Sequence, residues 1–309
     1  MHQLTKENTS WVFLLTSSDN VLIEDRHIRD ILYGTDVLRL KGVDSKHIVV
    51  ILDGPISTVS NSLIESIRKD CTILKINEIE IWRVDHVNEN LVLFVTGHGC
   101  ERGIVASPCI TPFQLFHWIK NTRQVKRAIV YLGQCFAGVF NFMDVAQRRQ
   151  DDQIISPEII VIGATNLFPS LSAQVTIQTH SEAGEDSRTK STWTANLFLF
   201  YLFQWILNPI DIDGDGCCTV ADSYKYAGVL SNNHCSAVKG LILSAVLADA
   251  SKINEFLKPE NSSSPESDEA QLRRASVEER FRQNSKLHAN HQEPWMLNSM
   301  PAQQIQYKL

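Results

Sequence analysis

The feature that most constrains this fold is a set of short runs of Val, Ile and Leu that no polar residue interrupts. Strands that are apolar at every position are buried on both faces, which is typical of a parallel sheet covered by helices on each side. The runs lie at residues 11–15, 47–53, 91–95, 127–132 and 159–163. Helical periodicity follows or separates them at residues 27–40, 113–119, 194–207 and 222–230. The sequence therefore predicts an α/β protein with three layers and a mostly parallel central sheet.

The composition changes near residue 258 of the 309 residues. Residues 259–309 hold four of the ten prolines and few large aliphatic residues, and residues 261–265 read as a flexible connector. Such a segment buries too little apolar surface to order itself. We therefore expect one αβα domain over residues 8–258 and a polar, disordered tail over 259–309. A short helix around residues 272–281 of this tail is an alternative.

Charge and hydropathy exclude several classes of protein. The net charge is −6 and no basic cluster stands out, so we expect no nucleic-acid partner. The longest apolar stretch, residues 197–207, is shorter than the roughly 20 residues that a spanning helix needs. Seven scattered cysteines do not form a disulfide framework, and the N-terminus lacks signal-peptide features. We expect a cytoplasmic or otherwise intracellular protein, with non-classical export and oligomeric state left open.

Two reactive side chains follow predicted strands, each within a turn of small residues. His98 lies between Gly97 and Gly99 after the strand at 91–95, and Cys135 follows the strand at 127–132. In a parallel sheet, reacting groups gather beyond the carboxyl ends of the strands. If these two strands are neighbours, the imidazole and the thiol face each other across one crevice.

This pair has a definite chemistry. A thiol becomes a useful nucleophile beside an imidazole that takes its proton, and the backbone amides of Gly99 and Cys135 are placed to bind an oxyanion. Acyl transfer from a peptide substrate, with no cofactor required, is the reaction class that results. The alternative is that Cys135 is a small buried apolar residue and His98 a structural one.

The two blocks carry a resemblance to a known family. Residues 96–99 (Thr-Gly-His-Gly), followed by residues 133–138 (Gly-Gln-Cys-Phe-Ala-Gly), look like the His and Cys blocks of the caspase–haemoglobinase clan of cysteine peptidases. Residues 24–27 and 47–53 are most similar to the legumain-like branch, which includes haemoglobinases and the GPI-anchor transamidase subunit. The resemblance covers about residues 10–250 and implies a caspase-like αβα sandwich with His98 and Cys135 as the catalytic dyad.

The resemblance also implies roles for two residues of the 24–27 block. Glu24 stands where legumains have the Asn that helps to place the catalytic His, so Glu24 is a candidate to orient His98. Arg26 matches the family arginine that lines the substrate pocket. The acidic pocket residues of legumains have no counterpart here, since Gly133 precedes Cys135 by two positions. Asparagine or aspartate specificity is therefore not carried over.

A second motif lies at residues 211–222. Asp211, Asp213 and Asp215 occupy positions 1, 3 and 5 of a calcium loop, with Gly216 at position 6 and Asp222 at position 12. Asp222 is shorter than the usual Glu, which weakens bidentate closure. Two interpretations stay open: a Ca²⁺ site, or a metal-free turn held by Asx hydrogen bonds.

Three functions follow from these patterns. The first is a cysteine endopeptidase that hydrolyses peptide bonds of a protein or peptide substrate through a thioester acyl-enzyme. The second is a transamidase or transpeptidase, in which an amine replaces water. The third is an inactive scaffold on the same fold that uses the crevice to bind partners.

Overall fold

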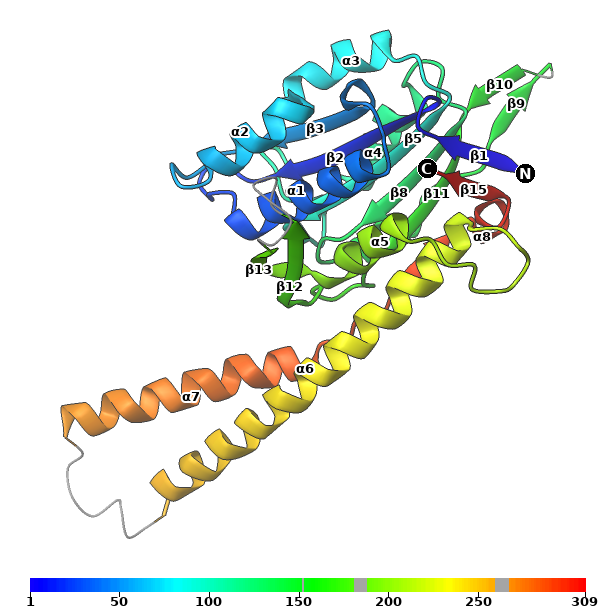
Figure 1. Cartoon of the computed structure of the whole chain (residues 1–309). Coiled ribbons are helices and arrows are strands. Elements are labelled where there is room, and N and C mark those ends of the chain that lie inside the picture. The colour runs from blue at the N-terminus through cyan, green and yellow to red at the C-terminus, as the bar shows by residue number, and fades with distance from the viewer. Residues whose placement is uncertain (152, 181–187, 259–266) are drawn as a thin grey trace. The chain divides into compact units, whose positions relative to one another are not determined.

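The central sheet has seven strands, and only its edge strand β14 runs antiparallel to its neighbour (Figure 1). The computed structural model describes residues 1–151, 153–180, 188–258 and 267–309, and this sheet is built from them. The order across the sheet is β14-β11-β8-β5-β2-β3-β4. The bounds are Thr9–Thr16 (β2), Ile48–Asp53 (β3), Thr72–Leu74 (β4), Asn90–Gly97 (β5), Arg127–Leu132 (β8), Glu158–Gly163 (β11) and Trp295–Leu297 (β14).

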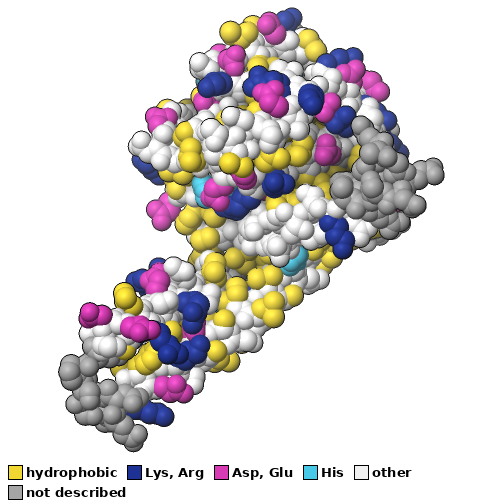
Figure 2. Space-filling model, turned by 60° about the vertical axis from the view of Figure 1, so that its left-hand side comes forward, with side chains coloured by type: hydrophobic (Ala, Val, Ile, Leu, Met, Phe, Trp, Pro, Cys, Tyr) yellow, Lys and Arg dark blue, Asp and Glu magenta, His cyan; other side chains and the backbone are white. Residues whose placement is uncertain are grey.

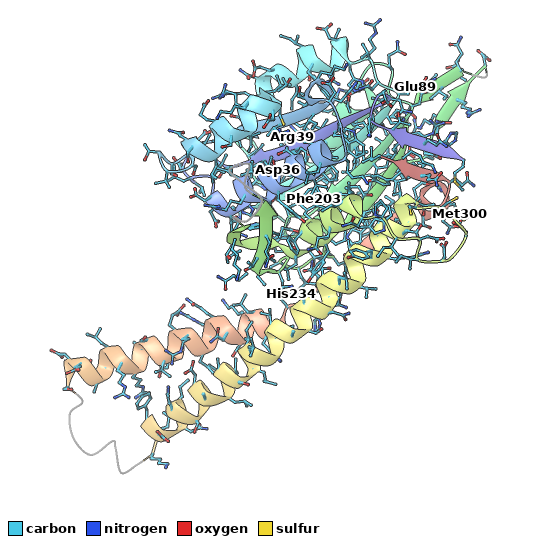
Figure 3. All side chains as sticks on the ribbon, in the orientation of Figure 1. Asp36, Arg39, Glu89, Phe203, His234 and Met300 are labelled. Carbon is cyan, nitrogen blue, oxygen red and sulfur yellow. The ribbon has the colours of Figure 1, made fainter. Side chains whose placement is uncertain are left out.

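Helices cover both faces of this sheet, so the α/β fold with three layers is confirmed. Apolar residues of α1, α2, α5 and the first turns of α6 form one core with the sheet, and those of α3 and α4 form a second core on the other face. Phe203 of α5, labelled in Figure 3, packs on Phe13 and Phe94 with ring centroids 5.9 and 5.1 Å away. The bounds are Asp25–Leu40 (α1), Asn61–Asp70 (α2), Ile79–Asp85 (α3), Pro112–Lys120 (α4), Leu197–Leu207 (α5) and Val220–Phe256 (α6).

Four two-stranded ribbons and several short helices complete the described elements. The ribbons are β1 (His2–Thr5) with β15 (Ile305–Lys308), β6 (Gly99–Cys100) with β7 (Gly103–Ile104), β9 (Arg148–Gln150) with β10 (Gln153–Ser156), and β12 (Ser172–His180) with β13 (Arg188–Asn196). The remaining helices are α7 (Asp268–Ala289), α8 (Ser299–Ala302) and the 3-10 turns Ser45–His47, Ile76–Glu78 and Ala137–Phe140.

All five predicted strands are present, but two of the predicted helices need correction. The helix expected over 194–207 begins at Leu197, because the residues before it form β13 and Asn196 caps the helix by accepting from the Leu199 N–H. Residues 192–194 of β13 (Thr-Trp-Thr) alternate in burial as a strand does: Trp193 is buried, and Thr192 and Thr194 are exposed. The helix expected over 222–230 is α6, which continues to Phe256.

The expectation of a disordered tail is wrong for the described residues 267–309. The chain divides into a first unit, residues 1–231 with 292–309, and a second unit, residues 232–291. β14 pairs with β11, and β15 pairs with β1, where Ile305 is fully buried. The low average hydropathy of the tail conceals these two short strands. The predicted connector at 261–265 lies outside the described residues.

The second unit consists of the later turns of α6 and the helix α7. Its internal contacts include the ion pair of Asp249 with Arg280 and the burial of Val277. Leu241 and Leu247 of α6 are 75% and 62% exposed, and apolar side chains are visible along this unit in Figure 2. In the described part of the chain, no helix combines the length and the hydropathy that crossing a bilayer requires.

Candidate active site

The strands that precede His98 and Cys135 are neighbours, as the sequence interpretation required. β5 and β8 pair in parallel from Asn90 with Arg127 to Val95 with Leu132. Their carboxyl ends therefore lie side by side near the centre of the sheet, and the end of β5 borders the switch in strand order between β2 and β5. This switch in strand order is the place where open α/β sheets bind their ligands.

The two turns that follow these strands touch each other. A Cβ added to Gly99 would overlap with the carbonyl oxygen of Cys135, and it would also meet the side chain of Gln134. Gly97, before His98, has a φ of +101°, which an L side chain rarely adopts. The glycines around His98 therefore bring its turn against the Cys135 backbone. The two residues predicted to donate oxyanion amides, Gly99 and Cys135, are thus brought together.

Glu24 hydrogen-bonds the imidazole of His98. The Oε1 atom of Glu24 lies 2.6 Å from Nε2 of His98, and its Oε2 atom lies 2.6 Å from Nε of Arg26. The Arg26 guanidinium, helped by His98, lowers the pKa of Glu24 from its ordinary 4.5 to about 2, although partial burial opposes this shift. Glu24 is therefore a carboxylate at neutral pH, and it accepts the Nε2 proton of His98. Nδ1 is left as the nitrogen that can take a proton from a thiol.

The Cys135 thiol is part-buried and contacts the next loop. Its Sγ accepts a hydrogen bond from the Ser170 N–H at 3.2 Å. Burial raises the pKa of Cys135, while the Ser170 contact and the charge of Arg26 act in the opposite direction. Within the described residues no hydrogen bond joins Cys135 to His98. Catalytic hydrogen bonds are often long without substrate and tighten when it binds.

Arg26, the candidate pocket residue, contacts the start of strand β12. Its Nη1 donates to the Ser172 hydroxyl at 3.1 Å, at the start of β12. The hairpin β12–β13 begins at Ser172 and ends at Asn196. Its tip, residues 181–187, lies outside the described residues. Arg26 therefore connects the Glu24–His98 pair to this hairpin and acts on the Cys135 thiol.

A buried network behind the site escaped the sequence interpretation. Asp30 of α1 accepts hydrogen bonds from the indole of Trp193 at 2.9 Å and from the Asn196 N–H. Asn196 in turn donates to the carbonyl of Gly133, two residues before Cys135. The available signal was Asp30 itself, an acidic residue next to Ile31 on the apolar stripe of a predicted helix. A carboxylate on such a stripe needs buried donors, but the sequence does not say which donors.

The Asp-rich loop forms only part of the predicted calcium site. Carboxylate oxygens of Asp211, Asp213 and Asp215 lie within 4.8 Å of one another. Asp222 is fully buried and accepts from the Thr219 N–H and hydroxyl at the start of α6. Asp211 accepts from the N–H groups of Gly214 and Gly216, an arrangement that a metal-free turn also has, and Asp213 pairs with Lys225. Three of the four predicted ligands gather, and the fourth caps a helix.

The comparisons with known proteins give no family for this chain. No family model matches it, and no curated protein matches it either.

Proposed function

We propose that the protein is a cysteine endopeptidase of the caspase–haemoglobinase type, with Cys135 as nucleophile and His98 as general base and acid. The observation that carries the proposal is the contact of the two turns, in which Gly99 lies directly against Cys135 at the ends of neighbouring strands. The carboxylate of Glu24 on Nε2 of His98 supports it, because this bond leaves Nδ1 for proton transfer.

The reaction would run through a thioester. His98 takes the thiol proton at Nδ1, and the thiolate of Cys135 attacks the carbonyl carbon of the scissile peptide bond. Amides of Gly99 and Cys135 hold the oxyanion that forms. His98 then gives its proton to the leaving amine, and water, activated by the same imidazole, hydrolyses the thioester. Glu24 stabilises the imidazolium that exists between the two proton transfers.

The experiment is active-site labelling with peptide acyloxymethyl ketones that vary in the residue before the reactive group. We expect covalent labelling at Cys135 in the folded protein and none in Cys135→Ala. Cys217→Ala serves as the matched control, because Cys217 is also a part-buried free thiol and lies outside the site. Absence of labelling in the folded protein across the whole panel, with labelling after denaturation, would contradict the proposal and favour a scaffold.

Peptide hydrolysis is then measured with substrates that have the peptide sequences of the ketones that react with Cys135. Products with a free carboxylate are expected. Added hydroxylamine, or a peptide with a free amino terminus, tests the transamidase alternative. A transamidase would give the hydroxamate or the new amide as its main product even with water in excess.

A further inference from the structure

A buried nitrogen near the dyad has no hydrogen-bond partner among the described residues. His27 lies in the first turn of α1, and its side chain is 3% exposed. Its Nε2 atom is buried and has no hydrogen-bond partner in the residues that the structure describes. A buried polar atom without a partner destabilises the folded protein, so native proteins rarely leave one unpaired. A ligand that this nitrogen binds would remove this destabilisation.

The surroundings of His27 decide which kind of ligand this is. The Thr96 hydroxyl donates to Oδ2 of Asp30 and lies 3.3 Å from Nδ1 of His27. Because the hydroxyl proton is used on Asp30, its oxygen accepts from the Nδ1–H of His27. A neutral imidazole with its proton on Nδ1 carries a lone pair on Nε2. The unpartnered atom is therefore a candidate metal ligand and not a donor.

Two further potential metal ligands, Glu24 and His98, lie beside His27. One ligand atom each of Glu24, His27 and His98 lies within 4.8 Å of the others. The rings of His27 and His98 are 5.2 Å apart and nearly perpendicular, at 82°. Glu24 directly precedes α1, His27 lies in the first turn of α1, and His98 lies in the turn after β5. Helix α1 packs on one face of the sheet that contains β5 (Figure 1).

We propose that Glu24, His27 and His98 form a Zn²⁺ site, with His27 Nε2, His98 Nε2 and Glu24 Oε1 as ligands and a fourth position left for solvent. Two imidazoles and one carboxylate are a donor set that zinc prefers, whereas Ca²⁺ and Mg²⁺ prefer oxygen ligands. Asp30, which reaches Nδ1 of His27 through Thr96, is the outer carboxylate that metal-bound histidines commonly have.

Small movements are enough to admit the ion. With bonds of about 2.0–2.2 Å and tetrahedral angles, two ligand atoms lie about 3.3 Å apart. Oε1 of Glu24 and Nε2 of His98 are 2.6 Å apart and must separate slightly, which their 45% and 37% exposed side chains allow. Arg26 binds Oε2 of Glu24 at 2.6 Å and Oε1 only at 3.4 Å, so the weaker bond to Oε1 is the one that the ion replaces.

Zinc in this position would inhibit the peptidase, a consequence that rests on the proposed function. The ion replaces the proton on Nε2 of His98, and the neutral ring then carries its proton on Nδ1. Nδ1 can no longer accept the proton of Cys135, so the dyad loses its base. The Nε2–H bond breaks and an Nδ1–H bond forms through solvent as the metal–ligand bonds form, so the number of protons on His98 stays the same.

The test is direct measurement of Zn²⁺ binding to the full-length reduced protein, with no substrate present, by competition with a chelating dye. We expect one Zn²⁺ that Ca²⁺ and Mg²⁺ do not displace, and at least a tenfold weaker affinity in both Glu24→Gln and His27→Gln. His117→Gln, which removes an exposed histidine of α4, should bind as the parent chain does. Glu24 is exposed enough that its variant keeps the fold, and thermal unfolding checks this for both variants.

Three results would overturn the site. The first is undiminished Zn²⁺ affinity in folded Glu24→Gln and His27→Gln. The second is loss of binding in Cys100→Ser, since the sulfurs of Cys100 and Cys109 lie 3.8 Å apart and offer a thiolate alternative. The third is a thiolate-to-metal charge-transfer band when Co²⁺ replaces Zn²⁺. Zn²⁺ binding is also measured in Cys135→Ala, where it should persist. The metal site is thus tested independently of peptidase activity, and the labelling of Cys135 is tested independently of the metal site.

Discussion

The carboxylate of Glu24 lies 2.6 Å from Nε2 of His98, and the same carboxylate is held by Arg26 on its other oxygen. A catalytic imidazole needs a fixed orientation and a fixed tautomer, and a hydrogen-bonded acceptor supplies both. Glu24 is the residue that precedes α1, and the N-terminus of this helix lies next to the end of β5. The pair therefore links the position of one helix to the protonation of the proposed base.

Glu24→Gln should lower kcat for peptide hydrolysis. The amide oxygen of Gln still accepts the Nε2 proton, so the tautomer survives, but the negative charge that stabilises the imidazolium is lost. We expect a decrease of about 10- to 100-fold, well below the ~10⁴-fold loss seen when the tautomer itself is wrong. Steady-state kinetics measure it. Glu89→Gln is the control, since Glu89, labelled in Figure 3, pairs with Lys126 away from the site; equal losses in both variants would contradict the role of Glu24.

The same substitution should change how stability depends on pH. The pKa of Glu24 is lowered from 4.5 to about 2, so its interactions stabilise the folded protein fully above pH 4.5 and are lost as the pH falls toward 2. The difference in the free energy of unfolding between the parent chain and Glu24→Gln should therefore be constant near neutral pH and shrink on acidification. Urea unfolding at several pH values measures this difference; a gap that widens with acid would refute the assignment.

Arg26→Ala should make the Cys135 thiol harder to ionise. Burial already raises the pKa of Cys135, and the positive charge of Arg26 opposes that rise. Without this charge, the pH profile of alkylation by iodoacetamide should move to higher pH. Arg39→Ala removes a charge from the same helix, where Arg39 pairs with Asp36 and Asp70, and should leave the profile unchanged. An unshifted or acid-shifted profile for Arg26→Ala would show that Arg26 does not act on the thiol.

The sequence predicted the strands and the two reactive turns because both depend on local patterns. Uninterrupted apolar runs identify buried strands, and glycines beside His98 identify a turn that approaches other backbone closely. The partners of these residues are set by tertiary contacts between distant segments. Ser170, which donates to the Cys135 sulfur, comes from a loop 35 residues away, and nothing in its neighbourhood marks it.

The tail shows a different limit of sequence reasoning. Averaged composition predicted disorder after residue 258, yet Trp295 forms part of an edge strand and its indole donates to the carbonyl of Thr165. Three apolar residues are enough for a strand when an existing sheet edge supplies the hydrogen bonds. Composition over fifty residues does not resolve so short an element, because its signal is averaged with the polar helix α7.

Asp30→Ala should destabilise the protein strongly and reduce activity. The Asp30 side chain accepts from the indole of Trp193 and the N–H of Asn196, and its removal leaves these buried donors unpaired. We expect a loss of about 2–5 kcal/mol in the free energy of unfolding, measured with urea. Asp36→Asn is the control on the same helix, labelled in Figure 3: burial raises the pKa of Asp36, so a neutral amide there should cost little. Equal losses in the free energy of unfolding for Asp30→Ala and Asp36→Asn would show that the hydrogen bonds of Asp30 do not stabilise the protein as proposed.

Gly99→Ala should reduce both stability and activity, because the new methyl group would overlap with the carbonyl oxygen of Cys135. Backbone atoms cannot move aside as a flexible side chain does, so the turn of His98 must shift away from Cys135. We expect about 1–3 kcal/mol of destabilisation, the usual cost of overpacking, and a larger relative loss of acyloxymethyl ketone labelling than of stability.

Gly240→Ala is the matched control for this change. Gly240 lies within α6 and has no atom near the position of an added Cβ. Alanine favours a helix by up to about 1 kcal/mol over glycine, so this variant should be as stable as the parent chain or more stable. Labelling at Cys135 should be unchanged in Gly240→Ala and strongly reduced in Gly99→Ala that is still folded. Normal labelling in folded Gly99→Ala would show that the close contact between the two turns is not needed for the reactivity of the thiol.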